Sequence, residues 1–271
     1  VLSEAYYMNT QFEKTTLKPP MGSGPYKLET VDQGRSVTYR RVKNYWGKDL
    51  AVNRGRYNFG TVRFDYYRDQ VVALEAFKAG LVDLRHEKDP GRWATGYASP
   101  AFAQGKIIKG EFSHGLPGGM KGFAFNTRRQ IFKDRKVRQA LAFAFDFEWV
   151  NKNFFHNSYA RTDSYFTNSE LAARGLPSAA ERALLKPFQK SLPPEVFEKS
   201  YQPPHTDGKG SDRKGLRTAM KLLRKAGWKL QGKRMMTATG TLAKFEILLV
   251  NPRNERLALA YARKLRRMGI G

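Results

Sequence analysis

Cysteine is absent from all 271 residues of the sequence. Disulfides, iron–sulfur clusters, cysteine-ligated zinc and thiolate nucleophiles are therefore excluded. Long apolar runs are also missing, because the two most apolar segments, 139–147 and 245–250, are interrupted by Asp146 and by Asn251-Pro252. Neither approaches the roughly 18 residues that a membrane-spanning helix requires. We therefore do not expect an integral membrane protein.

Motifs of catalysis and cofactor binding are equally scarce. The sequence contains no Walker A loop, no dinucleotide-binding glycine fingerprint and no Gly-x-Ser-x-Gly nucleophile elbow. The four histidines lack the short spacing of a metal site; they are His86, His114, His156 and His205. We therefore expect no enzymatic activity, no metal and no cofactor.

Acidic residues are few in comparison with basic ones. The chain has 49 Lys and Arg against 24 Asp and Glu, a net charge of +25. Residues 1–118 hold 18 basic and 12 acidic residues, so residues 119–271 hold the other 31 and 12. A basic surface of this kind is one mark of a nucleic-acid-binding module, which we keep as the alternative function. No helix-turn-helix, aromatic RNA-binding strand or KH loop accompanies it, and solvated helix faces have the same composition.

Hydrophobic residues at 41% and aromatic residues at 13% indicate a folded chain of one large or two smaller domains. In the first part, 26–31 and 36–42 form a predicted β-hairpin around a loop that contains Gly34. The pattern also predicts a helix capped by Asp69 and ending near Ala79, with Leu74 and Phe77 inward and Gly80 after it. Three further strands are predicted over 61–67, 81–84 and 106–109. The glycine-rich run 115–119 is the predicted domain boundary, and the charge balance changes there.

The second part alternates predicted helices with two apolar segments. The segments 122–126 and 245–250 are predicted strands, and 176–210 is a proline-rich surface excursion. Apolar spacing predicts helices over 135–144, 147–154, 213–226 and 255–268, the last followed by Gly269 as its C-cap. A strand should follow such a helix in an α/β chain, and residues 1–6 have no targeting segment. We therefore expect the sequence to be a fragment of a longer protein.

Several sequence blocks occur in an order that is typical of one family. They are Gly22-Ser23-Gly24-Pro25-Tyr26, Asn44-Tyr45-Trp46-Gly47-Lys48, Phe77-Lys78-Ala79-Gly80 with Asp83, Phe125-Asn126-Thr127 with 132–141, and the segment 219–228. These blocks resemble the family 5 extracellular solute-binding proteins of ABC transporters, which capture peptides and other solutes. Finer blocks at 64–69, 126–129, 146–149 and 164–170 are similar to the YejA-like subgroup of that family. The resemblance covers nearly the whole chain.

The resemblance implies an α/β fold of the bilobal, type II periplasmic-binding-protein kind, present here in part. Residues 1–118 would be the latter part of lobe I and residues 119–271 the first part of lobe II. It further implies a periplasmic substrate-binding component of an ABC importer, with a peptide or peptide-like ligand and permease subunits in the inner membrane as partners. We would expect no nucleic acid partner and a monomer at full length.

Ligand contacts in a bilobal binder are expected near the boundary between lobes, because closure brings those loops together. Residues after the strand predicted at 81–84 and after the crossover strand at 122–126 are the first candidates: Arg85, His86, Glu87, Asn126 and Arg128. Tyr165 and Phe166, with Met120, are further lining candidates. The alternative for each is a solvated or structural role. The carboxylate that pairs with the ligand amino terminus in peptide-binding relatives resembles nothing in this sequence.

Overall fold

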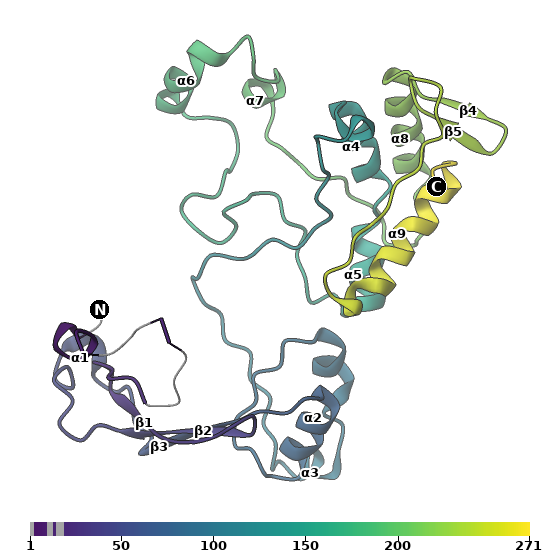
Figure 1. The fold of residues 1–271 in the computed structure, drawn as a ribbon. Helices are drawn as coiled ribbons and strands as arrows, with labels where there is room; N and C mark the ends of the chain where they lie inside the picture. The colour runs from purple at the N-terminus through teal and green to yellow at the C-terminus, as the bar shows by residue number, and fades with distance from the viewer. Residues whose placement is uncertain (1–2, 10–12, 15–18) are drawn as a thin grey trace. The chain divides into compact units, whose positions relative to one another are not determined.

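The computed structural model describes residues 3–9, 13–14 and 19–271 (Figure 1). Contacts divide the chain into two compact units, Val1–His86 and Glu87–Gly271. The lobe boundary predicted at 118/119 is a different division, and it stays a prediction.

The first unit is built on a three-stranded antiparallel sheet. Its strands are β1 (Tyr26–Asp32), β2 (Ser36–Arg41) and β3 (Thr61–Asp65), in the order β1-β2-β3. The turn between β1 and β2 closes with a 3.0 Å hydrogen bond from Arg35 N to Asp32 O, and Gly34 has a φ of +76°. A positive φ favours glycine, which has no Cβ, so the predicted hairpin is confirmed together with the role of Gly34 in its turn.

Helix α2 (Gln70–Lys78) follows the sheet and begins where its cap predicts. The Asp69 carboxylate accepts hydrogen bonds from Val71 N at 2.6 Å and Val72 N at 3.3 Å. Gly80 ends the helix at a φ of +76°. Leu74 is buried and Phe77 is half-buried, as the spacing predicts. A short helix, α1 (Glu4–Tyr7), precedes the sheet.

Two predicted strands are wrong. Residues 81–84 are irregular, with Leu81 72% and Leu84 87% exposed. Residues 106–109 are also irregular, with Ile107 buried but Ile108 88% exposed. Short apolar runs cannot pair without a neighbouring strand, and none lies beside either run in the described part of the chain.

The second unit begins with a small cluster around Glu87. A single π-helical turn, Arg92–Gly96, and helix α3 (Pro100–Ala103) form its framework. Ser99 caps α3 by accepting a 3.2 Å hydrogen bond from Phe102 N.

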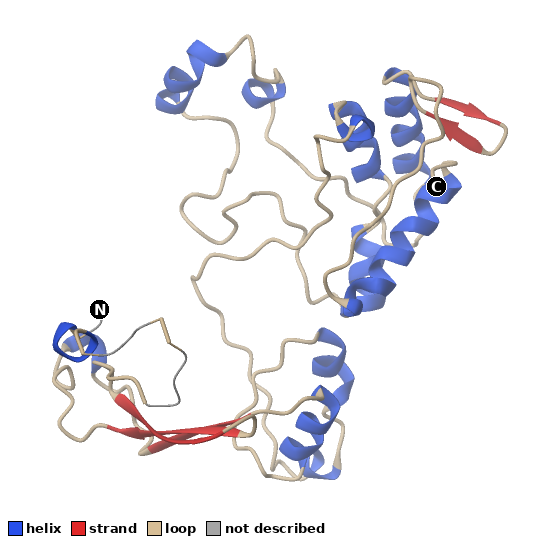
Figure 2. Ribbon diagram, viewed as in Figure 1, coloured by secondary structure: helices blue, strands red, loops and turns tan. Residues whose placement is uncertain are grey.

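The second unit contains four helices of nine or more residues and a two-stranded hairpin (Figure 2). Three of these helices, the hairpin and neighbouring segments form its hydrophobic core, to which Phe147–Phe155 supplies no residue. The helices are α4 (Arg135–Phe143), α5 (Phe147–Phe155), α8 (Arg213–Lys225) and α9 (Glu255–Arg267), and the hairpin joins β4 (Lys229–Gln231) to β5 (Arg234–Met236). The predicted inward residues of α4 and α8 are buried or half-buried. Leu141 and Leu223 are fully buried, and Gly269 follows α9 at a φ of +80°, as predicted.

The predicted strands at 122–126 and 245–250 are extended segments without strand pairing. Phe123, Phe125, Phe245 and Ile247 pack on the core, whereas Leu248 and Val250 are 91% and 96% exposed. Backbone bonds from Gly271 N to Ala243 O at 2.9 Å and from Phe245 N to Gly271 O at 3.1 Å join two extended stretches near the C-terminus. These segments are therefore held by packing of one face on the core and not by pairing in a sheet.

The proline-rich excursion contains two short helices that the sequence interpretation left as loop. They are α6 (Ala179–Leu185) and α7 (Glu195–Glu198), and neither buries a residue. Ser178 and Glu181 form a capping box at the start of α6, in which each side chain bonds the other's backbone N–H. The Ser-x-x-Glu pattern in the sequence indicates the start of a helix at this position.

Candidate functional site

Two loops that are far apart in the sequence are joined at the place where the lobe boundary is predicted. Asn168 donates its amide hydrogens to His114 O at 3.0 Å and to Leu116 O at 2.7 Å. Gly118 N adds a 2.7 Å bond to Thr167 O. We call residues 114–118 together with 164–169 the loop junction. Asn168 has a φ of +62°, a region that asparagine tolerates better than most residues.

Ser164 holds the second loop of the junction through hydrogen bonds to its side chain. It is buried, and its hydroxyl oxygen accepts hydrogen bonds from Phe166 N at 3.3 Å and Ala173 N at 3.1 Å. The two aromatic side chains that follow Ser164 are exposed. Tyr165 is 82% and Phe166 56% exposed. The predicted lining residues are therefore presented on a hydrogen-bonded loop.

Asn126 and Arg128 lie together in a second exposed turn. Asn126 Oδ1 accepts from Arg128 N at 3.2 Å and from Arg128 Nε at 3.3 Å, and Arg129 N closes the turn onto Asn126 O at 3.0 Å. The preceding Phe125 packs on the core, which fixes the start of the turn. Both predicted side chains are accessible, and their contact with a ligand stays a prediction.

Glu87 is the most tightly held of the predicted site residues. Its side chain is 2% exposed, and Arg92 reaches it as a fork, with Nε 3.1 Å from Oε2 and a terminal nitrogen 3.2 Å from Oε1. Asp89 N donates at 2.9 Å and Tyr97 Oη at 3.1 Å. Burial opposes ionisation of this carboxyl, but these donors and the Arg92 charge outweigh it and lower its pKa to about 2. Glu87 is therefore ionised and surrounded by internal donors.

Arg85 and His86 end the first unit, whereas Glu87 begins the second. Arg85 donates to Gln70 Oε1 at 3.4 Å, and His86 is exposed. Met120, the weaker lining candidate, is 49% exposed. The structure thus brings together Asn126 with Arg128, and Tyr165 with Phe166, within the second unit.

A polar cluster at the start of α5 was missed by the sequence interpretation. Thr206 Oγ1 donates to Asp146 Oδ1 at 2.6 Å and lies 3.0 Å from Glu148 Oε2, and His205 Nδ1 lies 2.6 Å from Glu148 Oε1. Burial opposes ionisation of Glu148, but its own backbone N–H, the Thr206 donors and His205 together lower its pKa. The sequence signal was Asp146-x-Glu148, which places one carboxylate at the N-cap and one in the first turn of the helix.

Arg161 and Lys264 supply positive charge near this cluster. Arg161 lies over the rings of Phe145 and Phe147, 5.4 and 5.3 Å from their centroids, and burial lowers its pKa. Lys264 Nζ lies 3.8 Å from Asp146 Oδ2 and donates to Gly210 O. The cluster ties the 205–210 loop to α5 and α9, which is a structural role.

Metal coordination finds no support in the part of the chain that the structure describes, where no group of three His, Asp or Glu side chains could hold an ion. No described helix is long and apolar enough to cross a bilayer.

The fold is that of periplasmic binding proteins. The periplasmic oligopeptide-binding protein of an oligopeptide ABC transporter from Thermotoga maritima matches 100% of this chain and 46% of its own, with a TM-score of 0.67 and 17% identity. NikZ from Campylobacter jejuni, solved in complex with Ni(L-His), matches 99% of this chain and 45% of its own, with a TM-score of 0.63 and 18% identity. At these identities the similarity defines the class of fold.

The family model of the bacterial extracellular solute-binding proteins, family 5 Middle, matches residues 2–271. The chain therefore belongs to family 5 of the extracellular solute-binding proteins, which are binding proteins and not enzymes. It is YejA-like: the uncharacterized protein YejA of Escherichia coli is 46% identical over 271 residues. The probable peptide-binding protein YejA and the peptidoglycan-binding protein YepA, both of Agrobacterium fabrum, are 42% and 40% identical over 258 and 268 residues.

The chain spans less than half the length of these curated relatives. The match to the Escherichia coli protein includes 100% of this chain and 45% of that protein. The match to the probable peptide-binding protein YejA of Agrobacterium includes 94% of this chain and 42% of that protein. The match to YepA includes 96% of this chain and 44% of that protein.

Proposed function

We propose that this chain forms part of the substrate-binding component of an ABC importer and captures oligopeptides or peptide-like solutes in the periplasm. The observation that carries the proposal is the loop junction, on which Tyr165 and Phe166 project outward from a hydrogen-bonded backbone. Peptide-binding sites combine apolar lining side chains with backbone polar groups that satisfy the ligand backbone. The names of the two Agrobacterium relatives support a ligand that contains peptide.

The remaining features of the proposal concern location and partners. Residues 1–118 belong to lobe I and residues 119–271 to lobe II, so the loop junction lies at their boundary. The full-length protein is a monomer that delivers ligand to permease subunits in the inner membrane. Arg85, His86, Glu87, Asn126 and Arg128 are the further residues proposed to contact the ligand or to position groups that do.

Native mass spectrometry of the full-length protein tests this proposal. Protein purified from a Gram-negative periplasm should carry copurified peptides, and these should be released on unfolding. Tyr165→Ala with Phe166→Ala should lower the fraction of loaded protein. Leu184→Ala, at an exposed position in α6, serves as the control. Protein that never carries peptide, and instead carries a metal chelate or nucleic acid, would overturn the proposal.

A basic nucleic-acid-binding module is the second candidate, because ten basic and no acidic residues lie between positions 213 and 245. Counterion release would make such binding fall steeply with rising salt. Tight binding of a short duplex, with a steep salt dependence and no peptide binding, would favour this candidate.

A further inference from the structure

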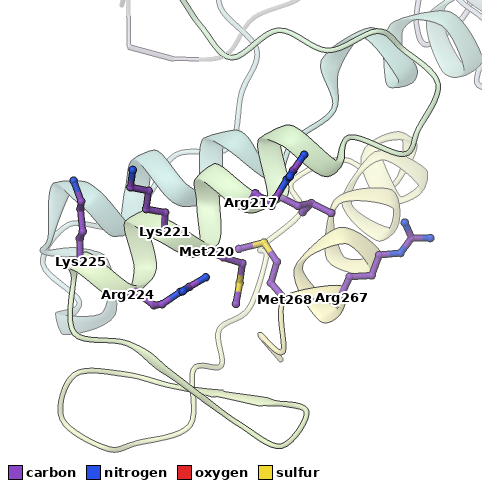
Figure 3. Close-up of a pocket in the computed structure, with 8 residues that line it drawn as sticks. Arg217, Met220, Lys221, Arg224, Lys225, Arg267 and Met268 are labelled. Carbon is purple, nitrogen blue, oxygen red and sulfur yellow. The ribbon is translucent and has the colours of Figure 1, made fainter.

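A groove with an apolar floor lies between α8 and the C-terminal end of α9. Its volume is about 760 Å³, and Leu216, Met220 and Met268 supply the apolar surface. Figure 3 shows Met220 and Met268 converging between the two helices. Met268 is only 3% exposed, and Leu216 and Met220 are half-buried against the core. The apolar floor is therefore recessed below the surface.

Basic side chains form the rim of this groove. They are Arg217, Lys221, Arg224 and Lys225 from α8 and Arg267 from the last turn of α9, and all five are exposed. Figure 3 shows Arg224 and Arg267 on opposite sides of the two methionines. Within the described residues, none of the five forms an ion pair, so their charge is available to an external partner.

The surrounding sequence does not neutralise this charge. Between Asp212 and Glu246 there are ten Lys and Arg residues and no acidic residue. The Asp212 carboxylate is occupied as the cap of α8, where it accepts a 2.7 Å hydrogen bond from Gly215 N. An uninterrupted positive field over a concave surface attracts anionic partners and raises their rate of association.

We propose that this groove docks an acidic amphipathic polypeptide segment of a partner protein. To contact the recessed floor, the partner must present protruding apolar side chains. To pair with the basic rim, it must carry carboxylates beside them. An amphipathic helix that inserts an apolar stripe provides both. A bilayer surface or a nucleic acid could meet the rim charges but would leave the methionine floor unused. The inference is independent of the proposed capture of peptides in the periplasm.

Fluorescence anisotropy with the full-length protein tests the docking. The probe is a labelled synthetic peptide of about 15 residues with Leu at i, i+3, i+4 and i+7 and Glu on both flanks. Arg224→Glu with Arg267→Glu reverses two rim charges. Lys229→Glu with Lys233→Glu makes the same charge change on the exposed β4–β5 hairpin and is the matched control. The rim variant should weaken binding by more than about tenfold, and the control by no more than about threefold.

Met220→Gln separates docking from general charge attraction. It leaves the charge unchanged and should weaken binding by about threefold or more, because it removes apolar contact with the floor. Vesicles containing phosphatidylglycerol and a single-stranded DNA are measured with the same variants. Equal losses in the rim and control variants, an unaffected Met220→Gln variant, or no binding of the peptide by the wild-type protein would each overturn the proposal. Stronger binding of vesicles or DNA that depends on the rim would overturn it as well.

Discussion

Replacement of Glu87 by Gln removes one charge from the cluster that opens the second unit and preserves the shape of the side chain. In the wild-type protein the buried carboxylate receives the fork from Arg92, the backbone N–H of Asp89 and the Tyr97 hydroxyl. Gln cannot accept all of these bonds, and it leaves the Arg92 guanidinium, whose side chain is 23% exposed, with the longer 3.7 Å ion pair to Asp89 in place of the fork. Loss of one partner from a largely buried pair is costly because the other charge remains desolvated.

The pKa of Glu87 sets the size of the effect. A fall from 4.5 to about 2 corresponds to about 3 kcal/mol of preference for the ionised form in the folded state. Because the folded-state pKa is lowered, this stabilisation is fully present above pH 4.5 and is lost as the pH falls from about 4.5 towards 2. We therefore expect Glu87→Gln to lower the free energy of unfolding by about 2–3 kcal/mol at pH 7, and by much less near pH 2.

Urea unfolding at a series of pH values, followed by tryptophan fluorescence, measures this difference. Trp93 lies in the same cluster, where its indole nitrogen donates to Glu111 at 2.7 Å. Glu75→Gln is the control, because Glu75 is exposed and pairs with Lys78 on the same helix at 2.9 Å; it should change stability by less than about 0.5 kcal/mol. An effect of Glu87→Gln equal to that of the control, or one that persists unchanged to low pH, would refute the reasoning.

Three further substitutions test other parts of the structure. Asn168→Ala should loosen the loop junction by about 1–3 kcal/mol, because it removes two hydrogen bonds and puts alanine at a φ of +62° that asparagine tolerates better. Hydrogen exchange at 114–118 measures this loss, and Asn168→Gly isolates the contribution of the side-chain hydrogen bonds. Leu141→Ala should lower the free energy of unfolding in urea by about 2–5 kcal/mol, since Leu141 is fully buried. Gly210→Ala places a Cβ 2.8 Å from the Trp149 ring and should lower the melting temperature more than Gly232→Ala, which meets open space at a similarly positive φ.

Helices were predictable from the sequence because their signals are local. Asp69 caps the helix that it was predicted to begin, Asp134 and Asp146 cap the helices predicted to start at 135 and 147, and Gly80 and Gly269 follow helices at positive φ. The four wrong or unpaired strands share a different cause. A run such as 245–250 is apolar enough for a strand, but strand formation depends on a neighbour elsewhere in the chain. Local pattern carries no information about that neighbour.

The candidate residues could be named from the sequence, but their arrangement could not be predicted, and their contact with a ligand stays a prediction. Sequence blocks indicated Tyr165 and Phe166, and both are exposed on the loop junction. The role of Asn168 in joining that loop to His114 and Leu116 could not be predicted, because it depends on two carbonyl groups more than 50 positions away. The internal donors around Glu87 likewise depend on a π-helical turn that no sequence pattern marked, because Arg92 begins this turn and Tyr97 follows it.

Isothermal titration of the full-length protein with a peptide that copurifies with it is the most direct test of the central claim. Wild-type protein should bind the peptide with one site per monomer, and Tyr165→Ala with Phe166→Ala should weaken binding by about tenfold or more, as expected for the loss of two aromatic contacts. Phe188→Ala, at a residue that is 60% exposed in the proline-rich excursion, should leave the affinity unchanged. Undetectable binding by the wild-type protein, or equal affinities for all three proteins, would contradict the account.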